Sequence, residues 1–186
     1  MKTILVITIG YPNPNKGAST VVFYHYLEAI RESGHKVEHL ILITPSEVSK
    51  DSYSKYIEAI KPNSVFNVST FVISEENMVY RKNLEFHVFE SLSSLKKVIN
   101  CIKPDLTICF DIFAAATARK VGLNNLLIWL GDLYFHTTIY HAGYSFLAEL
   151  SISSFFKLLR ATVSSILWKK LYNKVLSGQK NVVVSS

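Results

Sequence analysis

The sequence has 186 residues, of which 49% are hydrophobic and 18% charged, and this balance excludes a disordered chain. That length suits one well-buried domain and would be cramped for two. Lys and Arg number 20 against 14 Asp and Glu, and the formal net charge of +6 favours an anionic partner such as phosphate, nucleic acid or acidic lipid. No run of about 18 uncharged apolar residues predicts a membrane span, and the first apolar run is too short for a secretory signal.

The two cysteines, Cys101 and Cys109, lie in apolar stretches. We interpret both as buried, reduced thiols of a cytoplasmic protein. Their spacing matches no metal-ligand pattern, so we predict no metal site.

Apolar, β-branched runs alternate with segments of helical periodicity along most of the chain. The apolar runs predict strands over residues 3–9, 37–43, 65–73, 106–110, 126–130 and 182–184. The periodic segments predict helices over residues 19–33, 53–60, 84–102, 114–121 and 145–176. Because the strands are continuously apolar, they fit a parallel sheet covered on both faces. The expected fold class is α/β, with a doubly wound, mostly parallel, Rossmann-like sheet that has helices on both faces.

Candidate site residues follow three of these strands. In a doubly wound sheet, ligands bind beyond the carboxyl ends of the strands, at the point where the strand order reverses. If the strands have the common order 3-2-1-4-5-6, the loops after strands one, four and five meet there. These loops supply the candidates Gly10, Lys16, Gly17, Ser19, Asp111, Asp132 and His136.

Each candidate also has a structural interpretation. The loop that contains Gly10 and Gly17 is neither GxGxxG nor Walker A, so it fits an ordinary strand-to-helix connection as well as a phosphate cradle. Asp111 is suited to act as a general base or to accept a hydrogen bond from a substrate hydroxyl, and equally to cap the following helix. His136 lies in the aromatic segment YFHTTIYH, which we expect to be a loop where histidines are more often structural.

Residues 145–176 form a basic amphipathic segment. Ile152, Phe156, Leu159, Val163, Ile166 and Leu167 make one apolar stripe, and Phe155, Trp168 and Tyr172 add aromatic side chains near its edges. Lys157, Arg160, Lys169, Lys170 and Lys174 oppose a single acid, Glu149. The pattern is typical of a helix lying on an anionic membrane surface. It also fits a helix that packs on the core and leaves its basic face in water.

The order of several motifs resembles the N-terminal, acceptor-side domain of family 4 glycosyltransferases, which have the two-domain GT-B fold. The motifs are ILVITIGYPNPNKGAST, ESGHKVEHLILI, KPDLTICFD, LIWLGDLYFH and NVVVSS. The resemblance implies that Gly17 lies near a donor diphosphate, that Asp111 lines the acceptor site and that Asp132 is the Asp of the fifth-strand motif. We predict that Asp111 and Asp132 serve catalysis. We also predict that Lys16, Gly17 and Ser19 bind the donor and that Gly10, Asp111 and His136 contact substrate. The family's second loop glycine is Ala18 here, and its fifth-strand His is Gly131.

The resemblance implies transfer of a sugar from a nucleotide sugar to a glycan or lipid-linked acceptor in cell-surface polysaccharide synthesis. It implies no cofactor, because the nucleotide sugar is a substrate held mainly by a second domain. We expect residues 1–186 to be one domain that is inactive without that second domain or a partner subunit. The alternative is a non-catalytic binding or membrane-anchoring subunit that pairs with a catalytic partner. We expect a cytoplasmic protein, peripheral on the cytoplasmic membrane face, that binds no nucleic acid.

Overall fold

The computed structural model describes residues 1–15, 18–43, 48–60, 66–72, 92–131 and 133–184. Six strands form one sheet with the order β3-β2-β1-β4-β5-β6, and every pair of neighbours is parallel. The strands are β1 (Thr3–Ile9), β2 (Lys36–Ile43), β3 (Phe66–Val72), β4 (Leu106–Phe110), β5 (Leu126–Leu130) and β6 (Val182–Val184). The predicted fold class and the strand order assumed for it are confirmed.

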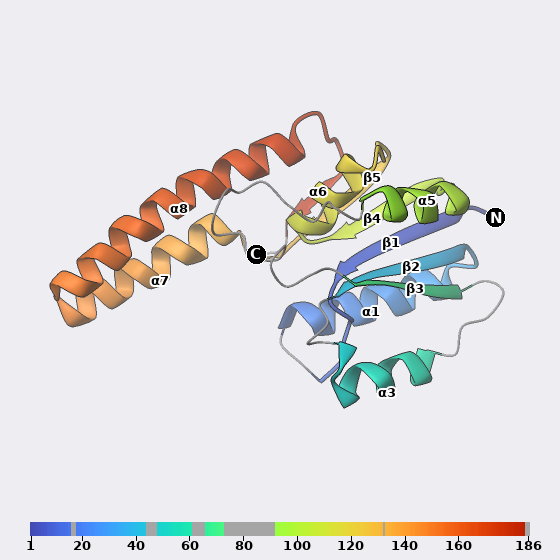
Figure 1. The fold of residues 1–186 in the computed structure, drawn as a ribbon, viewed down its shortest axis with the longest axis horizontal. Helices are drawn as coiled ribbons and strands as arrows, with labels where there is room; N and C mark the ends of the chain where they lie inside the picture. Colours follow the sequence, from blue (N-terminus) through green and yellow to red (C-terminus); the bar gives the residue numbers. More distant parts are fainter. Residues whose placement is uncertain (16–17, 44–47, 61–65, 73–91, 132, 185–186) are drawn as a thin grey trace.

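Helices cover both faces of this sheet (Figure 1). They are α1 (Ala18–Glu32), α3 (Asp51–Ile60), α5 (Leu92–Ile102), α6 (Ile112–Lys120), α7 (Tyr134–Glu149) and α8 (Ile152–Leu176). One face packs against α1 and α3, and the other packs against α5, α6 and the last turns of α8. Helix α5 begins at Leu92, and the earlier part of the helix predicted over 84–102 lies outside the described residues.

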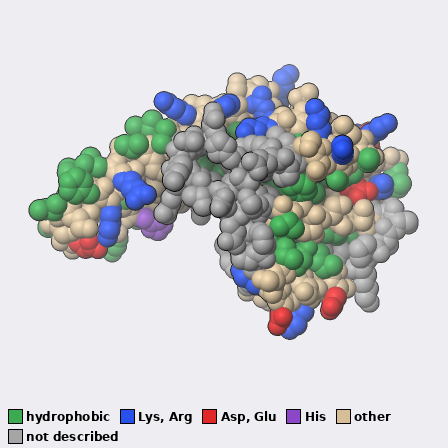
Figure 2. Space-filling view, viewed as in Figure 1, with side chains coloured by type: hydrophobic (Ala, Val, Ile, Leu, Met, Phe, Trp, Pro, Cys, Tyr) green, Lys and Arg blue, Asp and Glu red, His purple; other side chains and the backbone are tan. Residues whose placement is uncertain are grey.

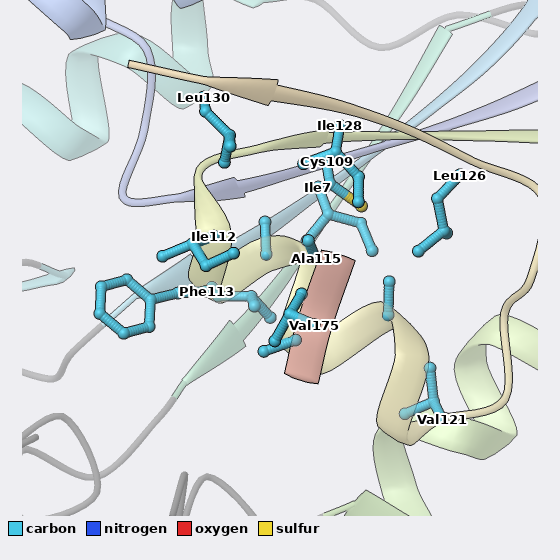
Figure 3. Close-up of a cluster of buried hydrophobic side chains, with 14 of the residues drawn as sticks. Ile7, Cys109, Ile112, Phe113, Ala115, Val121, Leu126, Ile128, Leu130 and Val175 are labelled. Carbon is cyan, nitrogen blue, oxygen red and sulfur yellow. The ribbon is translucent and has the colours of Figure 1, made fainter. Parts of the chain in front are cut away.

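The strand alternation explains why the apolar runs are continuous. Along β1, Ile4 and Val6 join the cluster beneath α1, while Leu5 and Ile7 join the cluster beneath α6. Figure 3 shows the second cluster, in which Ile7, Cys109 and Ile128 from three strands meet the apolar side chains of α6. Cys109 is buried as predicted, but Cys101 is exposed, so its predicted burial is wrong. Cys101 lies in the last turn of α5, on the side away from the core residues Leu95 and Ile99.

The segment 145–176, predicted to be one helix, is part of a helical hairpin. Helix α7 already begins at Tyr134, so the predicted aromatic loop around His136 is also wrong. The chain reverses at Leu150, whose backbone is left-handed with φ 44°, and at Ser151, which caps α8. The Ser151 side chain accepts a hydrogen bond from the backbone N–H of Ser154, and the Ser154 side chain accepts one from the backbone N–H of Ser151. The hairpin projects away from the sheet (Figure 1).

The base of α8 belongs to the core. Trp168 and Tyr172, predicted near the edges of the apolar stripe, are buried, and the Trp168 ring lies 5.4 Å from the ring of Phe113 on α6. Arg119 fixes the end of the helix, because its Nη1 donates to the carbonyls of Lys174, Val175 and Ser177 at 2.9, 2.6 and 3.1 Å. A cation at a helix C-terminus also complements the partial negative charge there.

Arg119→Met is expected to lower the free energy of unfolding by about 2 kcal/mol, because three carbonyls lose a charged donor. Urea unfolding monitored by circular dichroism measures this change. Lys97→Met, an equally charge-reducing change at an exposed position of α5, is the matched control and should alter the free energy of unfolding by less than about 0.5 kcal/mol. Equal effects of the two substitutions would contradict an anchoring role for Arg119.

Candidate functional site at the carboxyl edge of the sheet

Three neighbouring strands end side by side at the carboxyl edge. In the sheet register Thr8 of β1 lies opposite Phe110 of β4, which in turn lies opposite Trp129 of β5. Neighbouring strands are about 4.8 Å apart. Asp111 directly follows Phe110, and Gly10 and Gly131 come two residues after Thr8 and Trp129, so all three residues lie at this edge. The strand order reverses between β1 and β4, because β2 and β3 lie on one side of that pair and β5 and β6 on the other. Ligands of doubly wound sheets bind at such a reversal.

Asp111 combines two local features. Its Oδ1 accepts a hydrogen bond from the backbone N–H of Phe113 at 3.0 Å, so the residue caps α6. Its backbone has φ 90° and ψ 154°, a region that glycine occupies readily and other residues rarely. Such a conformation costs of the order of 1–3 kcal/mol. The helix-cap interpretation is therefore confirmed. The strained residue also carries a carboxylate at the point where the strand order reverses.

A buried hydrogen-bonded chain shapes the backbone at Gly10. Thr8 Oγ1 donates to the Gly10 carbonyl at 2.7 Å and lies 3.0 Å from Nε2 of His39 on β2. Because the only hydroxyl proton of Thr8 is used on Gly10, His39 Nε2 must carry a proton and donate to Thr8. His39 Nδ1 then accepts, and the Tyr56 hydroxyl of α3 lies 3.5 Å from it. Gly10 itself has φ 71°, and its N–H donates to the Leu42 carbonyl at 2.7 Å.

The charge states of His39 and Tyr56 in this series of hydrogen bonds follow from their burial. Desolvation lowers the pKa of His39 to about 3, so the imidazole is neutral at physiological pH. Desolvation also raises the pKa of Tyr56, whose hydroxyl therefore stays protonated and able to donate. The first turn of the loop after β1 is thus held by neutral groups.

Tyr11 attaches the same loop to α3. Its side chain is buried, its hydroxyl is hydrogen-bonded with Ser52, and its ring lies 5.6 Å from the ring of Tyr53 and 5.3 Å from that of Tyr56. Thr8, His39, Tyr56 and Tyr11 were not among the predicted site residues. The available signal was a histidine at the start of the apolar run HLILI, where a polar side chain needs a buried partner.

The predicted site residues fall into three groups. Gly10 and Asp111 follow β1 and β4, which are neighbours in the sheet, and both lie at its carboxyl edge. His136 lies in the first turn of α7, just beyond β5, with an exposed side chain whose ring is 4.8 Å from that of Phe135. Ser19 lies in the first turn of α1, but its side chain, like Lys16, Gly17 and Asp132, is outside the described residues. Among the residues that are described, no three His, Cys, Asp or Glu side chains gather as a metal site.

A known structure is similar to this chain in its fold. Over 100% of its length the chain matches 47% of LpCGTa, which was crystallised in complex with UDP, with a TM-score of 0.53 and 12% sequence identity. The two proteins share a fold. At this identity the likeness shows the fold alone, an α/β, Rossmann-like parallel sheet. The chain spans about half the length of LpCGTa.

Weaker matches are to UGT2 of Phytolacca americana. The apo structure gives a TM-score of 0.44 and 11% identity over 82% of this chain and 34% of that one. The structure complexed with UDP-2fluoro-glucose and pterostilbene gives 0.44 and 10% over 81% and 35%. No protein-family model and no curated protein matches the sequence.

Proposed function

We propose that residues 1–186 form the acceptor-side, Rossmann-like domain of a GT-B glycosyltransferase of the family 4 type. The enzyme would move a sugar from a nucleotide sugar to a glycan or lipid-linked acceptor in cell-surface polysaccharide synthesis. The observation that carries this proposal is the parallel sheet that shares the fold of LpCGTa over the whole chain and ends, at its reversal point, in Asp111. Complex formation with UDP in LpCGTa supports a nucleotide-sugar donor for this chain as well.

Asp111 is the residue to which we assign the acceptor. One carboxylate oxygen is tied to the start of α6, which fixes the group at the sheet edge. A fixed carboxylate can accept a hydrogen bond from the acceptor hydroxyl and draw its proton as the glycosidic bond forms. Gly10, whose carbonyl is held by Thr8, forms the neighbouring wall and we assign it to substrate contact. Asp132, which follows β5 in the sequence, and His136, in the first turn of α7, extend the same site in our proposal.

The donor side of the site begins at the loop before α1. We assign Lys16, Gly17 and Ser19 to contact with the donor diphosphate, since a helix N-terminus and a Lys side chain attract phosphate. Most of the nucleotide would be held by a second domain or a partner subunit, and the 186 residues alone would transfer no sugar. No cofactor enters this proposal.

The sequence of the gene beyond Ser186, or of a co-purifying partner, tests this proposal first. We expect a second Rossmann-like domain with a paired-glutamate motif. The complete protein should then release nucleotide from a nucleotide sugar only when an acceptor is added. Absence of such a domain from both the gene and any partner would overturn the proposal.

The alternative, a non-catalytic anchoring subunit, is favoured by one observation, the projecting α7–α8 hairpin (Figure 1). In that case sugar transfer by the complex would survive Asp111→Asn and depend on the hairpin. Loss of transfer with Asp111→Asn would instead support the enzymatic role.

A further inference from the structure

The α7–α8 hairpin exposes large apolar side chains around its whole outer end. Exposure reaches 72% for Leu147 near the end of α7, 74% for Leu150 at the reversal and 79% for Ile152 at the start of α8. Figure 2 shows hydrophobic side chains gathered over the part of the hairpin farthest from the sheet. Further exposed members are Tyr140, Tyr144, Phe155, Phe156, Leu159 and Val163. So much exposed apolar surface marks an interaction site.

These side chains lie on opposite outer faces of the hairpin. Ser165, which donates to the Phe135 carbonyl at 3.0 Å, marks the face of α8 that packs on α7. At 100° per residue, the stripe through Ile152, Phe156 and Val163 lies on the far side of α8 from Ser165. Helix α7 likewise carries its exposed stripe through Tyr140, Tyr144 and Leu147. A folded partner would cover one of these faces, whereas lipid can surround both faces and the turn.

The charges of the hairpin also favour lipid. Residues 134–176 carry five Lys or Arg residues and one acid, Glu149, together with His136 and His141. Lys157 and Arg160 are exposed and lie about 8 and 12 Å along α8 from Ile152, at 1.5 Å per residue. Apolar faces of surface-bound helices enter a bilayer by about 5–10 Å. When the tip of the hairpin, residues 147–152, is inserted, the two cations therefore lie at the level of the lipid phosphates.

We propose that the α7–α8 hairpin docks tip-first on an anionic phospholipid bilayer. Leu147, Leu150, Ile152 and Phe156 enter the acyl boundary, and Lys157 and Arg160 contact headgroup phosphates. The hairpin does not cross the bilayer, since no helix within the described ranges is both long and apolar enough to span it. This docking deepens the proposed function by bringing a lipid-linked acceptor within reach, yet it depends on none of the residues assigned to sugar transfer.

Vesicle co-sedimentation tests the apolar part of this proposal. The chain should bind vesicles of phosphatidylcholine with about one third phosphatidylglycerol, and Leu150→Ser with Ile152→Ser should weaken binding about tenfold. Val72→Ser, which removes an apolar side chain 49% exposed at the end of β3, is the control and should leave binding unchanged. Equal binding by the tip variant and the wild type would overturn the proposal.

Matched charge variants test the headgroup contacts. Lys157→Gln with Arg160→Gln should lower binding about tenfold and make it less sensitive to salt. Lys96→Gln with Lys97→Gln changes the net charge by the same amount at exposed positions of α5 and should have little effect. Equal losses in the two pairs would show attraction by net charge alone and would contradict tip-first docking.

Glu149→Gln is expected to strengthen binding to the anionic vesicles about fivefold, because it removes the one carboxylate at the tip. Glu58→Gln, on the exposed side of α3, makes the same chemical change away from the hairpin and should leave binding unaltered. Weaker binding by Glu149→Gln would contradict the assigned orientation.

A tryptophan at position 156 reports insertion directly. Phe156→Trp emission should shift to shorter wavelength when vesicles are added, while the buried Trp129 and Trp168 keep theirs in the wild type. If vesicles bind to none of these proteins and Leu150→Ser with Ile152→Ser converts a dimer into a monomer, the hairpin is a contact between two copies of the chain and the proposal is overturned. If the complete protein binds vesicles but transfers no sugar, that result would support membrane docking and overturn the proposed function.

Discussion

Asp111→Asn is expected to lower sugar transfer by the complete enzyme at least about a hundredfold, if Asp111 removes the acceptor proton. The amide oxygen of Asn can still accept from the Phe113 N–H, so the α6 cap and the fold should persist. The free energy of unfolding should therefore change by less than about 1 kcal/mol. Transfer rates and urea unfolding measured on the same preparations separate the two effects.

Two control variants sharpen this prediction. Asp105→Asn alters a carboxylate at the opposite end of the same strand, where Oδ2 accepts from the Thr3 N–H at 2.7 Å, and should leave transfer unchanged. Asp111→Gly removes the cap but relieves the strained backbone, two stability effects of opposite sign. It should unfold close to the wild-type midpoint and still be inactive. Full transfer by Asp111→Asn would show that the residue only caps α6.

His39 is expected to make the fold sensitive to acid. Its pKa is about 3 in the folded chain and about 6.5 when unfolded, so the unfolded state binds more protons between these values. The free energy of unfolding therefore has its full value above about pH 6.5 and decreases as the pH falls towards 3. Between pH 7 and pH 5 the loss from this one group should be about 2 kcal/mol.

Urea unfolding at pH 7, 6 and 5 measures this loss, and His39→Gln should abolish it while retaining an amide that can donate to Thr8. A nuclear magnetic resonance titration provides a check that needs no variant. The His39 ring signals should stay constant from pH 8 to pH 5. Titration of His39 near 6.5 would contradict its burial among neutral partners.

Thr8→Val is expected to lower the free energy of unfolding by about 2–3 kcal/mol, because it leaves the His39 Nε2 proton buried without an acceptor. The Gly10 carbonyl loses its donor as well, so transfer by the complete enzyme should also fall. Thermal unfolding and transfer assays check the two effects. Thr70→Val near the end of β3 is a control, because the hydroxyl that it removes, 2.6 Å from that of Tyr53, is exposed. No loss of stability would contradict the hydrogen-bond directions assigned here.

The sheet was predictable because its signals are local. Each strand is a continuous apolar run, and such runs separated by helical periodicity leave few topologies open. The hairpin was not predictable in the same way. The apolar pattern continues through Leu150, which has a left-handed backbone at a position where glycine would usually indicate a helix end. The Ser151 cap pairs with Ser154, whereas a capping box usually has Glu or Gln at that position. Burial of Trp168 depends on α6, which is distant in sequence.

The candidate site was predictable only in outline. Strand ends and the assumed order were enough to bring Gly10 and Asp111 to one edge, because parallel strands finish together. The support beneath Gly10 joins Thr8, His39 and Tyr56 from three elements, and that contact exists only after folding. The strained φ of Asp111 has no sequence signature, since aspartate is also common at ordinary helix caps. Roles for Gly10, Lys16, Gly17, Ser19, Asp111, Asp132 and His136 in substrate binding or catalysis remain predictions.

The most direct test of the central claim is nucleotide release from a panel of nucleotide sugars by the complete gene product, with any partner that co-purifies. Membrane lipid extract supplies the acceptor, and Asp111→Asn is assayed beside the wild type. We predict release that requires both one nucleotide sugar and the acceptor and that Asp111→Asn reduces at least about a hundredfold. Acceptor-dependent release that is equal in the variant, or no release with any nucleotide sugar, would contradict it.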